Sequence, residues 1–302
     1  MITSTKPLIR RRRLSLDSGK VLFLSDIHLG SRTFVAQDEL LDLLERLATD
    51  EGLGHLVLLG DIFDFQHSSE ETVIEQSRDF MQKLYNLSSR GIGVDYVVGN
   101  HDLPFLERHN WVSDNFGIPE TMWEVHYAHL HLQVESKLFH LEHGHLHDPS
   151  FKKHRELYQL ISETFGPIAD NWPGLKDWLG RLYKKLHLIR EIITPSSDGY
   201  IQQYEGAFNE FKIAAARILF EEDCQYVCFG HTHRPYLREF LDDKTYVNTG
   251  CWTRYRTCMV YDPRDDNFTW FEHGRKELIS LEGLELLLGE VPQSTLANAL
   301  PS

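Results

Sequence analysis

The stretch VLFLSDIHLG at residues 21–30 decides the fold, because it joins a short apolar run to a polar turn. The apolar run, VLFLS, predicts a buried strand, and the turn places Asp26 and His28 directly after it. The same arrangement occurs in HLVLLGDIFD (55–64) and in GVDYVVGNHD (93–102). We therefore predict three buried strands, each ending at acidic, amide or imidazole side chains.

Helical periodicity separates these strands. Residues 35–49 place leucines on one face, and residues 71–89 also have a helical pattern. The succession strand, helix, strand, helix, strand predicts a mostly parallel sheet, and such sheets place their sites at the carboxyl edge. The leucines predicted to be buried are Leu40, Leu43, Leu44 and Leu47.

A second group of strands is predicted after residue 120. The segments that alternate or run apolar are VHYAHLHLQVE (125–135), KLFHLEHG (137–144), QYVCFG (225–230), KTYVNTG (244–250), TCMVYD (257–262) and FTWFEH (268–273). Turn residues separate them, which favours a second sheet packed on the first. The predicted fold class is α/β, a two-sheet β-sandwich flanked by helices with a helical insertion.

The predicted domain is interrupted once and has an extension at each end. Residues 1–19 are a basic N-terminal tail, 20–278 the domain, and 279–302 a C-terminal helix and tail. The insertion at 149–222 carries apolar residues at helical spacing, which predicts packing against the body. The alternative is a cap whose apolar underside receives part of a substrate.

Composition limits the classes of partner. The 302 residues are 41% hydrophobic and 25% charged, with a formal net charge of −14. That acidity disfavours a nucleic-acid partner, which needs a cationic face, but it allows a phosphorylated substrate held through metals. The four cysteines are predicted to be reduced thiols in the core. Composition does not determine the oligomeric state.

The expected location is the cytoplasm. No window approaches the roughly 18 apolar residues that a membrane span needs, and no signal-peptide pattern follows the first arginines. The arginine run is expected to be solvated. The alternative is a peripheral contact with anionic lipid headgroups at the inner face of the membrane.

Five short polar motifs fall at the ends of predicted strands. Each is weak alone, but so many polar groups at one sheet edge would destabilise the fold unless something bound them. Their conjunction predicts a metal site. The motifs are Asp26-Ile27-His28, Gly60-Asp61-Ile62-Phe63-Asp64, Gly99-Asn100-His101-Asp102, His143-Gly144-His145 and Gly230-His231-Thr232-His233.

The residue types suit a pair of divalent cations. Two such ions about 3.5–4 Å apart repel each other and need a bridging carboxylate, for which Asp61 on the central strand is the natural candidate. The imidazoles disfavour a pure magnesium or calcium site and favour manganese, with iron, zinc or cobalt as alternatives. A hydroxide between the metals is the expected nucleophile. The predicted ligands are Asp26, His28 and His233 for one metal, and Asn100, His143 and His231 for the other.

Further polar residues are assigned roles beside the metals. His101 is predicted to protonate the leaving group, with Asp102 orienting its ring. Asp64 is predicted to support a metal ligand. For both aspartates, an ordinary turn or helix-capping role is the alternative.

Three other residues are candidates for substrate binding. Arg32 and Arg234 flank the first and last motifs, where a guanidinium would hold a phosphate. His145 lies at the edge of the fourth motif. A surface position at a motif edge would give the same pattern for all three.

The five motifs resemble the signature of the calcineurin-like metallophosphoesterase superfamily: D-x-H, G-D-x-x-D, G-N-H-[DE], a histidine-glycine block and G-H-x-H. The resemblance covers about residues 20–275. It implies a β-sandwich flanked by helices. It also implies for Asp61, the two ligand sets and His101 the roles given above on chemical grounds.

Within the superfamily, the chain resembles the UDP-2,3-diacylglucosamine pyrophosphatase branch of lipid A synthesis. The shared features are SDIHLG (25–30), GDIFD (60–64), GHTHRP (230–235), NTGCW (248–252) and the helical insertion, which in that branch caps the site and receives acyl chains. The chain departs from the branch at three positions. It has His101 where arginine is typical, His145 where aspartate is usual, and Cys251 where many relatives have aspartate.

The expected function is therefore hydrolysis of a phosphoester or pyrophosphate, with a UDP-2,3-diacylglucosamine-type nucleotide lipid as the first candidate substrate. A phosphodiesterase or phosphatase acting on a small nucleotide or a phosphoprotein is the alternative enzyme. A metal-binding scaffold of the same fold is the non-enzymatic alternative. It predicts missing ligands, whereas every ligand position here is filled.

Overall fold

The structure is a computed structural model, and the ranges that it describes form the body of the molecule. The segments 149–197 of the predicted insertion and 279–302 of the predicted C-terminal helix lie outside these ranges. The described residues are 11–14, 19–31, 34, 36–49, 52–102, 110–148, 198–240, 243–253 and 256–272.

The first sheet has six strands and contains the three strands predicted at the start of the chain. β2, β3, β4 and β5 run parallel, and β11 and β12 extend the sheet antiparallel beyond β2. Their order across the sheet is β12 (Asn267–Glu272), β11 (Thr257–Asp262), β2 (Lys20–Leu24), β3 (Leu53–Leu59), β4 (Gly93–Val97) and β5 (Glu124–His126).

The second sheet also has six strands and packs against the first. β7, β8 and β10 are parallel neighbours, whereas β6 and β9 pair antiparallel with β7 and β10. Their order across the sheet is β1 (Arg11–Leu14), β6 (His129–Val134), β7 (Lys137–Glu142), β8 (Tyr226–Phe229), β10 (Thr245–Thr249) and β9 (Pro235–Glu239).

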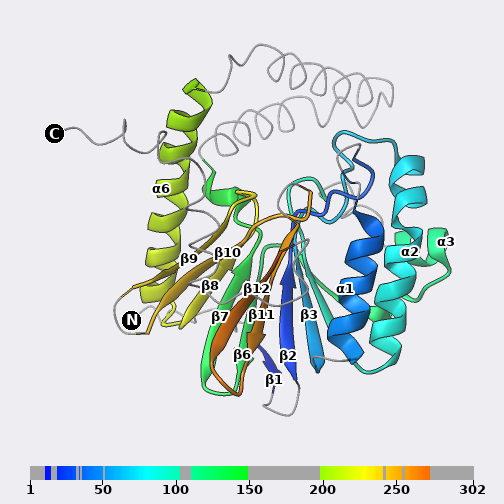
Figure 1. Ribbon diagram of the computed structural model, residues 1–302, viewed down its shortest axis with the longest axis horizontal. Helices are drawn as coiled ribbons and strands as arrows, with labels where there is room; N and C mark the ends of the chain where they lie inside the picture. The colour runs from blue at the N-terminus through cyan, green and yellow to red at the C-terminus, as the bar shows by residue number, and fades with distance from the viewer. Residues whose placement is uncertain are drawn as a thin grey trace, which may run out of the picture.

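Helices cover the outer face of each sheet, so the molecule has four layers (Figure 1). α1 (Gln37–Thr49) and α2 (Glu70–Ser89) lie on the first sheet, with α3 (Trp111–Phe116) and the short helix η3 (Glu120–Met122) beside α2. α6 (Asp198–Glu221) lies on the second sheet, and η4 (His145–His147) follows β7. The predicted two-sheet sandwich flanked by helices is confirmed.

Side-chain alternation explains the layers. In β2, Val21 and Phe23 face the core between the sheets, whereas Leu22 and Leu24 face the core beneath α1 and α2. A strand buried on both faces is mostly apolar, which is why the central strands show no regular polar alternation. The four leucines predicted to face inward from α1 are all buried. The four cysteines are buried free thiols, as predicted.

The basic N-terminal segment differs from the predicted tail. Arg11–Leu14 forms β1, which pairs with β6 at the edge of the second sheet. The Arg12 guanidinium lies 3.1 Å from the buried Asp95 carboxylate of β4, and 2.9 Å from Glu124 of β5. A buried carboxylate needs such a partner, so the arginine run supplies a cation to the interior.

Within the described ranges, no helix combines the length and apolar character that crossing a bilayer requires.

Candidate metal centre

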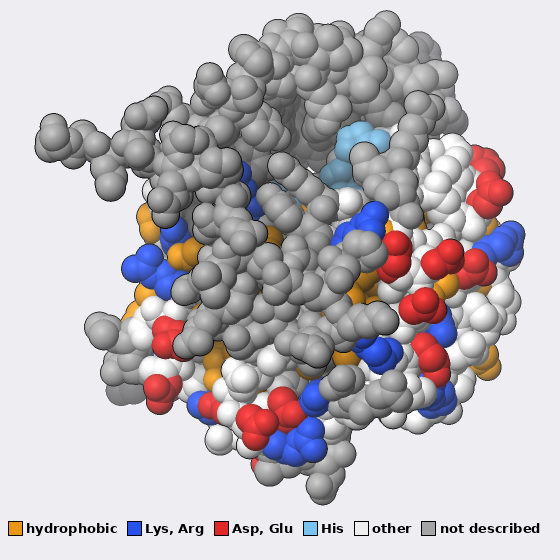
Figure 2. Space-filling model, in the orientation of Figure 1, with side chains coloured by type: hydrophobic (Ala, Val, Ile, Leu, Met, Phe, Trp, Pro, Cys, Tyr) orange, Lys and Arg blue, Asp and Glu red, His pale blue; other side chains and the backbone are white. Residues whose placement is uncertain are grey.

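The polar motifs meet at one end of the sandwich, where the strands of both sheets run into loops. Backbone hydrogen bonds tie these loops together: Asp26 N–H donates to Gly60 O, His28 N–H to Asp61 O, and Gly230 N–H to His143 O. On the face shown in Figure 2, histidine side chains gather at one place on the surface. The parallel strands therefore deliver residues distant in sequence to one site.

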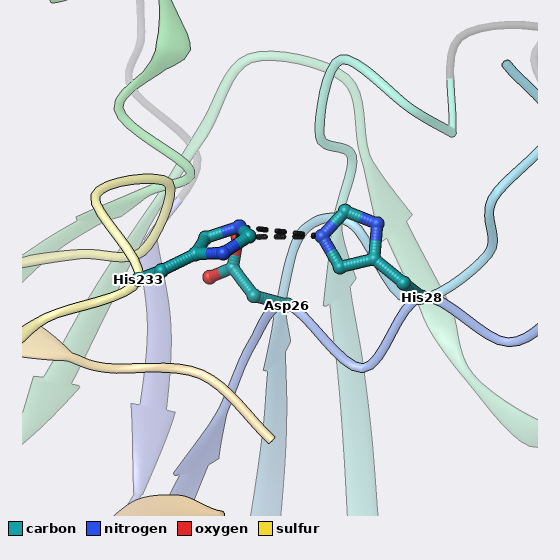
Figure 3. A group of neighbouring side chains, drawn as sticks. All are labelled: Asp26, His28 and His233. Carbon is teal, nitrogen blue, oxygen red and sulfur yellow. Dashed lines mark hydrogen bonds and ion pairs between the residues drawn. The ribbon is translucent and has the colours of Figure 1, made fainter. Parts of the chain in front are cut away.

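The first group of ligands is Asp26, His28 and His233 (Figure 3). His233 Nε2 lies 3.0 Å from Asp26 Oδ1 and 3.3 Å from His28 Nε2. Two donors each about 2.1 Å from one ion are about 3 Å apart when they subtend a right angle, so the spacing suits a shared cation. The predicted ligand set for one metal is brought together.

The second group contains Asp61, His143 and His231. His143 Nδ1 lies 2.9 Å from the carbonyl oxygen of Leu59, to which it donates, and this leaves the Nε2 lone pair directed at Asp61. Asp148 Oδ2 lies 3.0 Å from His231 Nε2 and accepts a hydrogen bond from it, which leaves Nδ1 of that ring to bind a cation. Such hydrogen bonds fix the orientation of metal-binding imidazoles.

Asp61, a member of the second group, also approaches the first. Its Oδ2 is 3.9 Å from His28 Nε2 of the first group and 3.1 Å from His143 Nε2 of the second. Its Oδ1 accepts from the backbone N–H of His101 at 2.8 Å, which fixes the carboxylate. This position is compatible with the bridging role predicted for Asp61, which stays a prediction.

Buried polar atoms test whether these residues fit cations. Among the described residues, Asn100 Oδ1 is buried without a hydrogen-bond partner, and Asp26 Oδ1 and His143 Nε2 are buried facing only His233 and Asp61 of the same centre. Leaving such atoms unpaired destabilises a fold by about 1–3 kcal/mol each, and binding a cation removes that penalty. The residues therefore fit the metals.

The pKa shifts of the histidines also indicate a site for a cation. Burial opposes a charge on His143, but the Asp61 carboxylate outweighs burial and raises the pKa of His143 to about 10. Burial lowers the pKa of His28 to about 4, against the opposing effect of Asp61. The site favours positive charge beside Asp61, which a cation supplies in place of the proton.

The ligands are also held in an unusual backbone conformation. Left-handed φ angles are uncommon for residues other than glycine and cost of order 1–3 kcal/mol each. They persist where the surrounding structure enforces them, as at functional sites. Five predicted ligands have φ between 52° and 65°: Asp26, His28, Asp61, His231 and His233.

Motif glycines stand directly against the ligands. A Cβ at Gly99 would collide with Asp61 Oδ1 and the Asp61 backbone nitrogen, and one at Gly60 would collide with the His143 ring. A Cβ at Gly230 would meet the Asp26 carboxylate. The glycines of these motifs are therefore required by close approach.

Gly99→Ala is expected to weaken metal binding by about 10–100-fold, because the added methyl group displaces the Asp61 carboxylate. Metal content after dialysis, measured by mass spectrometry, checks this expectation. Gly91→Ala is the control, since no atom stands near its Cβ position, and its φ of 88° adds a backbone strain that Gly99 does not carry. The control should lose about 1 kcal/mol of stability and keep its metals. Unchanged metal affinity in Gly99→Ala would contradict the account.

The structure corrects the predicted partner of His101. Asp64, not Asp102, contacts the ring: Asp64 Oδ1 lies 2.9 Å from His101 Nδ1 and 3.0 Å from His67 Nδ1. Burial opposes a charge on His101, but Asp61 and Asp64 outweigh burial and raise its pKa. A raised pKa favours the protonated ring that the predicted role of His101 requires.

Asp102 contacts backbone N–H groups instead of the His101 ring. Its carboxylate accepts from the backbone N–H groups of Asp61, Phe63 and Gly99 at 2.7–2.9 Å. It joins the second motif to the third and holds the backbone of the bridging aspartate. Its adjacency to His101 in the sequence suggested an orienting role, but consecutive residues here point in different directions.

The last three candidates are the residues predicted to bind substrate. Arg32 lies outside the described residues, and Arg234 is exposed beside the last motif, with its backbone N–H donating to Thr232 Oγ1. His145 is buried, with its ring centroid 5.5 Å from that of His143, and burial lowers its pKa to about 3. Substrate binding by these three stays a prediction.

Supporting residues were missed at the sequence level. Ser25 donates to Asp26 Oδ2 and lies 2.7 Å from Thr249 Oγ1, so the hydroxyls secure the non-ligating oxygen of that carboxylate. Gln66 donates to the backbone oxygen of Asn100 at 2.9 Å. Adjacency to a motif was the only signal for Ser25, and no signal pointed to Gln66.

Comparison with known proteins gives one family and several relatives. A family model described as calcineurin-like phosphoesterase matches residues 19–235. A UDP-2,3-diacylglucosamine hydrolase of Porphyromonas gingivalis is 25% identical, over 80% of this chain and 94% of its own. One from Aeromonas salmonicida is 25% identical, over 80% of this chain and 89% of its own. Among solved structures, a dimetal phosphatase from Danio rerio is 12% identical and covers 87% of this chain and 98% of its own, with a TM-score of 0.46.

Proposed function

Because the chain belongs to the calcineurin-like phosphoesterase family, and so is a metal-dependent phosphoester hydrolase, we propose that it cleaves the pyrophosphate bond of a UDP-2,3-diacylglucosamine-type nucleotide lipid. Water adds its oxygen to one phosphorus, and the bridging P–O bond breaks. The products are a nucleoside monophosphate and an acylated sugar phosphate.

The observation that carries the lipid part of this proposal is the contact between α6 and the centre. α6 ends the predicted insertion, and its Phe211 is buried with its ring centroid 5.8 Å from that of the ligand His231. An apolar side chain of the insertion therefore adjoins the metal centre. Phe211 itself is packed in the core between α6 and the second sheet, so α6 is anchored beside the centre, where an acyl chain attached near the reacting phosphate would lie. The relatives that share most of the chain's length are hydrolases named for an acylated nucleotide sugar, which supports the same substrate class.

The residues of the centre have separate proposed roles. When bound, the cations would ionise water and neutralise charge on the phosphoryl oxygens. His101 keeps a proton at Nε2 while Asp64 accepts from Nδ1. The proposed ligands are Asp26, His28 and His233 for one cation, Asn100, His143 and His231 for the other, and Asp61 for both.

One observation favours a second candidate, a phosphodiesterase with an alcohol leaving group. His101 and Asp64 form a proton-donating pair, and an alkoxide needs a proton more than a departing phosphate does. The two candidates therefore differ in how strongly turnover depends on this pair.

Turnover of UDP-2,3-diacylglucosamine with Mn²⁺, followed by mass spectrometry of both products, tests the proposal. The deacylated UDP-sugar should be a poorer substrate, because it lacks the apolar chains that α6 would contact. Phe211→Leu should reduce this preference and leave cleavage of bis(p-nitrophenyl) phosphate unchanged. Equal turnover of acylated and deacylated substrates would remove the lipid proposal. Preferred cleavage of small diesters or cyclic nucleotides would establish the second candidate.

A further inference from the structure

A separate cluster of imidazoles lies on the outer face of the second sheet, on β6 and β7 before the loop that carries His143. β6 and β7 pair antiparallel, with His131 opposite His140 and His129 opposite Glu142. Alternate residues of a strand share a face, so these four side chains lie together on one surface. The residues between them face the core between the sheets.

Glu222 completes this cluster from a distant part of the sequence. It directly follows α6, and its Oε2 lies 2.7 Å from His131 Nε2 and 2.7 Å from His140 Nδ1. Potential ligand atoms of these three residues all lie within 4.8 Å of one another. The two imidazoles are 2% and 3% exposed, so they are desolvated at the point where they meet the carboxylate.

We propose that His131, His140 and Glu222 bind one divalent transition-metal cation of the zinc type, separate from the dinuclear centre. Two imidazole nitrogens and one carboxylate oxygen form a ligand set typical of zinc with an open fourth position. That position is taken by water on the solvent side, where the exposed ring of His129 lies.

The arrangement has features that favour a cation over hydrogen bonds alone. Both imidazoles lie against a single oxygen atom of Glu222, so a small shift of the three side chains would let their ligand atoms surround one ion. His140 Nε2 has no hydrogen-bond partner among the described residues and lies 3.7 Å from Glu142 Oε2. A metal on Nδ1 would direct the Nε2–H of this ring at that carboxylate, the usual support for a metal-bound imidazole.

Crowding of imidazoles supports the same conclusion. The ring of His129 stacks on His140 with centroids 5.0 Å apart and meets the edge of His131 at 5.0 Å. These three rings face two carboxylates, Glu222 and Glu142, so they cannot all be protonated without mutual repulsion. One cation on two of these rings supplies positive charge without that repulsion.

Another cluster of candidate ligands differs because an arginine already neutralises its carboxylates. Asp95, Glu124 and His126 also bring ligand atoms together, but the Arg12 guanidinium lies 3.1 Å from Asp95 and 2.9 Å from Glu124. The protein's own cation already neutralises these carboxylates. His126 therefore serves as a matched control for a histidine beside a carboxylate that binds no metal.

The experiment measures zinc bound per chain for the full protein at pH 8, by equilibrium dialysis and mass spectrometry. The double variant His131→Gln/His140→Gln and the single variant Glu222→Gln should each bind one zinc ion fewer than wild type. Both should keep their phosphoesterase activity, and the control His126→Gln should bind as many zinc ions as wild type. An unchanged zinc count in Glu222→Gln would overturn the proposal.

Crystals of the wild-type chain soaked in Zn²⁺ give an answer that does not depend on any variant. Anomalous scattering at the zinc edge should show a peak between β6, β7 and the end of α6. The absence of that peak, with zinc present at the dinuclear centre, would refute the third site and leave the proposed function untouched.

Discussion

Asp61→Asn is expected to lower kcat/KM by about 10³-fold or more and to reduce metal occupancy. Asp61 Oδ2 lies within 3.9 Å of histidines from both ligand groups, so this carboxylate is placed where it would contribute to both cations. An amide preserves the shape but not the charge that balances two cations. Metal catalysis is worth several kcal/mol of transition-state stabilisation, and each 1.36 kcal/mol is a factor of ten in rate.

Turnover of bis(p-nitrophenyl) phosphate under Mn²⁺, with metal content of the same samples, measures this effect. Asp95→Asn is the matched control, because Asp95 is also a buried aspartate with imidazole neighbours but lies in the Arg12 network. The control should lose stability and keep both its metals and its turnover. If Asp61→Asn retained two metals and full activity, the bridging role would be refuted and a metal-binding scaffold favoured.

His101→Ala is expected to lower kcat by about 10²–10⁴-fold while metal content stays unchanged. Its ring contacts Asp64 through Nδ1, and its Nε2 lies 3.9 Å from Oδ2 of Asp61, the proposed bridging ligand. Asp64→Asn should give a smaller loss, about 10–100-fold, because it removes the support and not the donor. His67→Ala is the control, since His67 contacts the same Asp64 oxygen from the exposed side.

The leaving group separates proton donation from a purely structural role. Comparison of kcat for aryl and alkyl phosphodiesters should show a smaller loss in His101→Ala with the aryl substrates, whose leaving groups need no proton. An equal loss with both substrate types would indicate that His101 acts through structure or charge alone. Unchanged turnover would remove it from the mechanism.

Local sequence determined much of this centre. The apolar runs before Asp26, Asp61 and Asn100 predicted buried parallel strands, and parallel strands must bring their following residues to one edge. The predicted histidine ligands likewise follow strands that the structure confirms. Periodicity and strand-end polarity are local signals, so they were available without the fold.

Other features depend on contacts between distant residues. The arginine run gave no sign that Arg12 would neutralise Asp95, because their contact depends on how the two sheets pack. Asp102 stood next to His101 in sequence, yet Asp64 reaches the ring because the turns after β3 and β4 face each other. His131 and Glu222 are separated by most of the insertion, so alternation alone identified the strand and not its partner.

The most direct test of the account is anomalous scattering from crystals grown with Mn²⁺. Two peaks are expected at the loop end of the sandwich, one enclosed by Asp26, His28 and His233 and one by Asn100, His143 and His231, with Asp61 between them. A site that stays free of metal at saturating Mn²⁺, or a single ion that Asp61 does not touch, would contradict it.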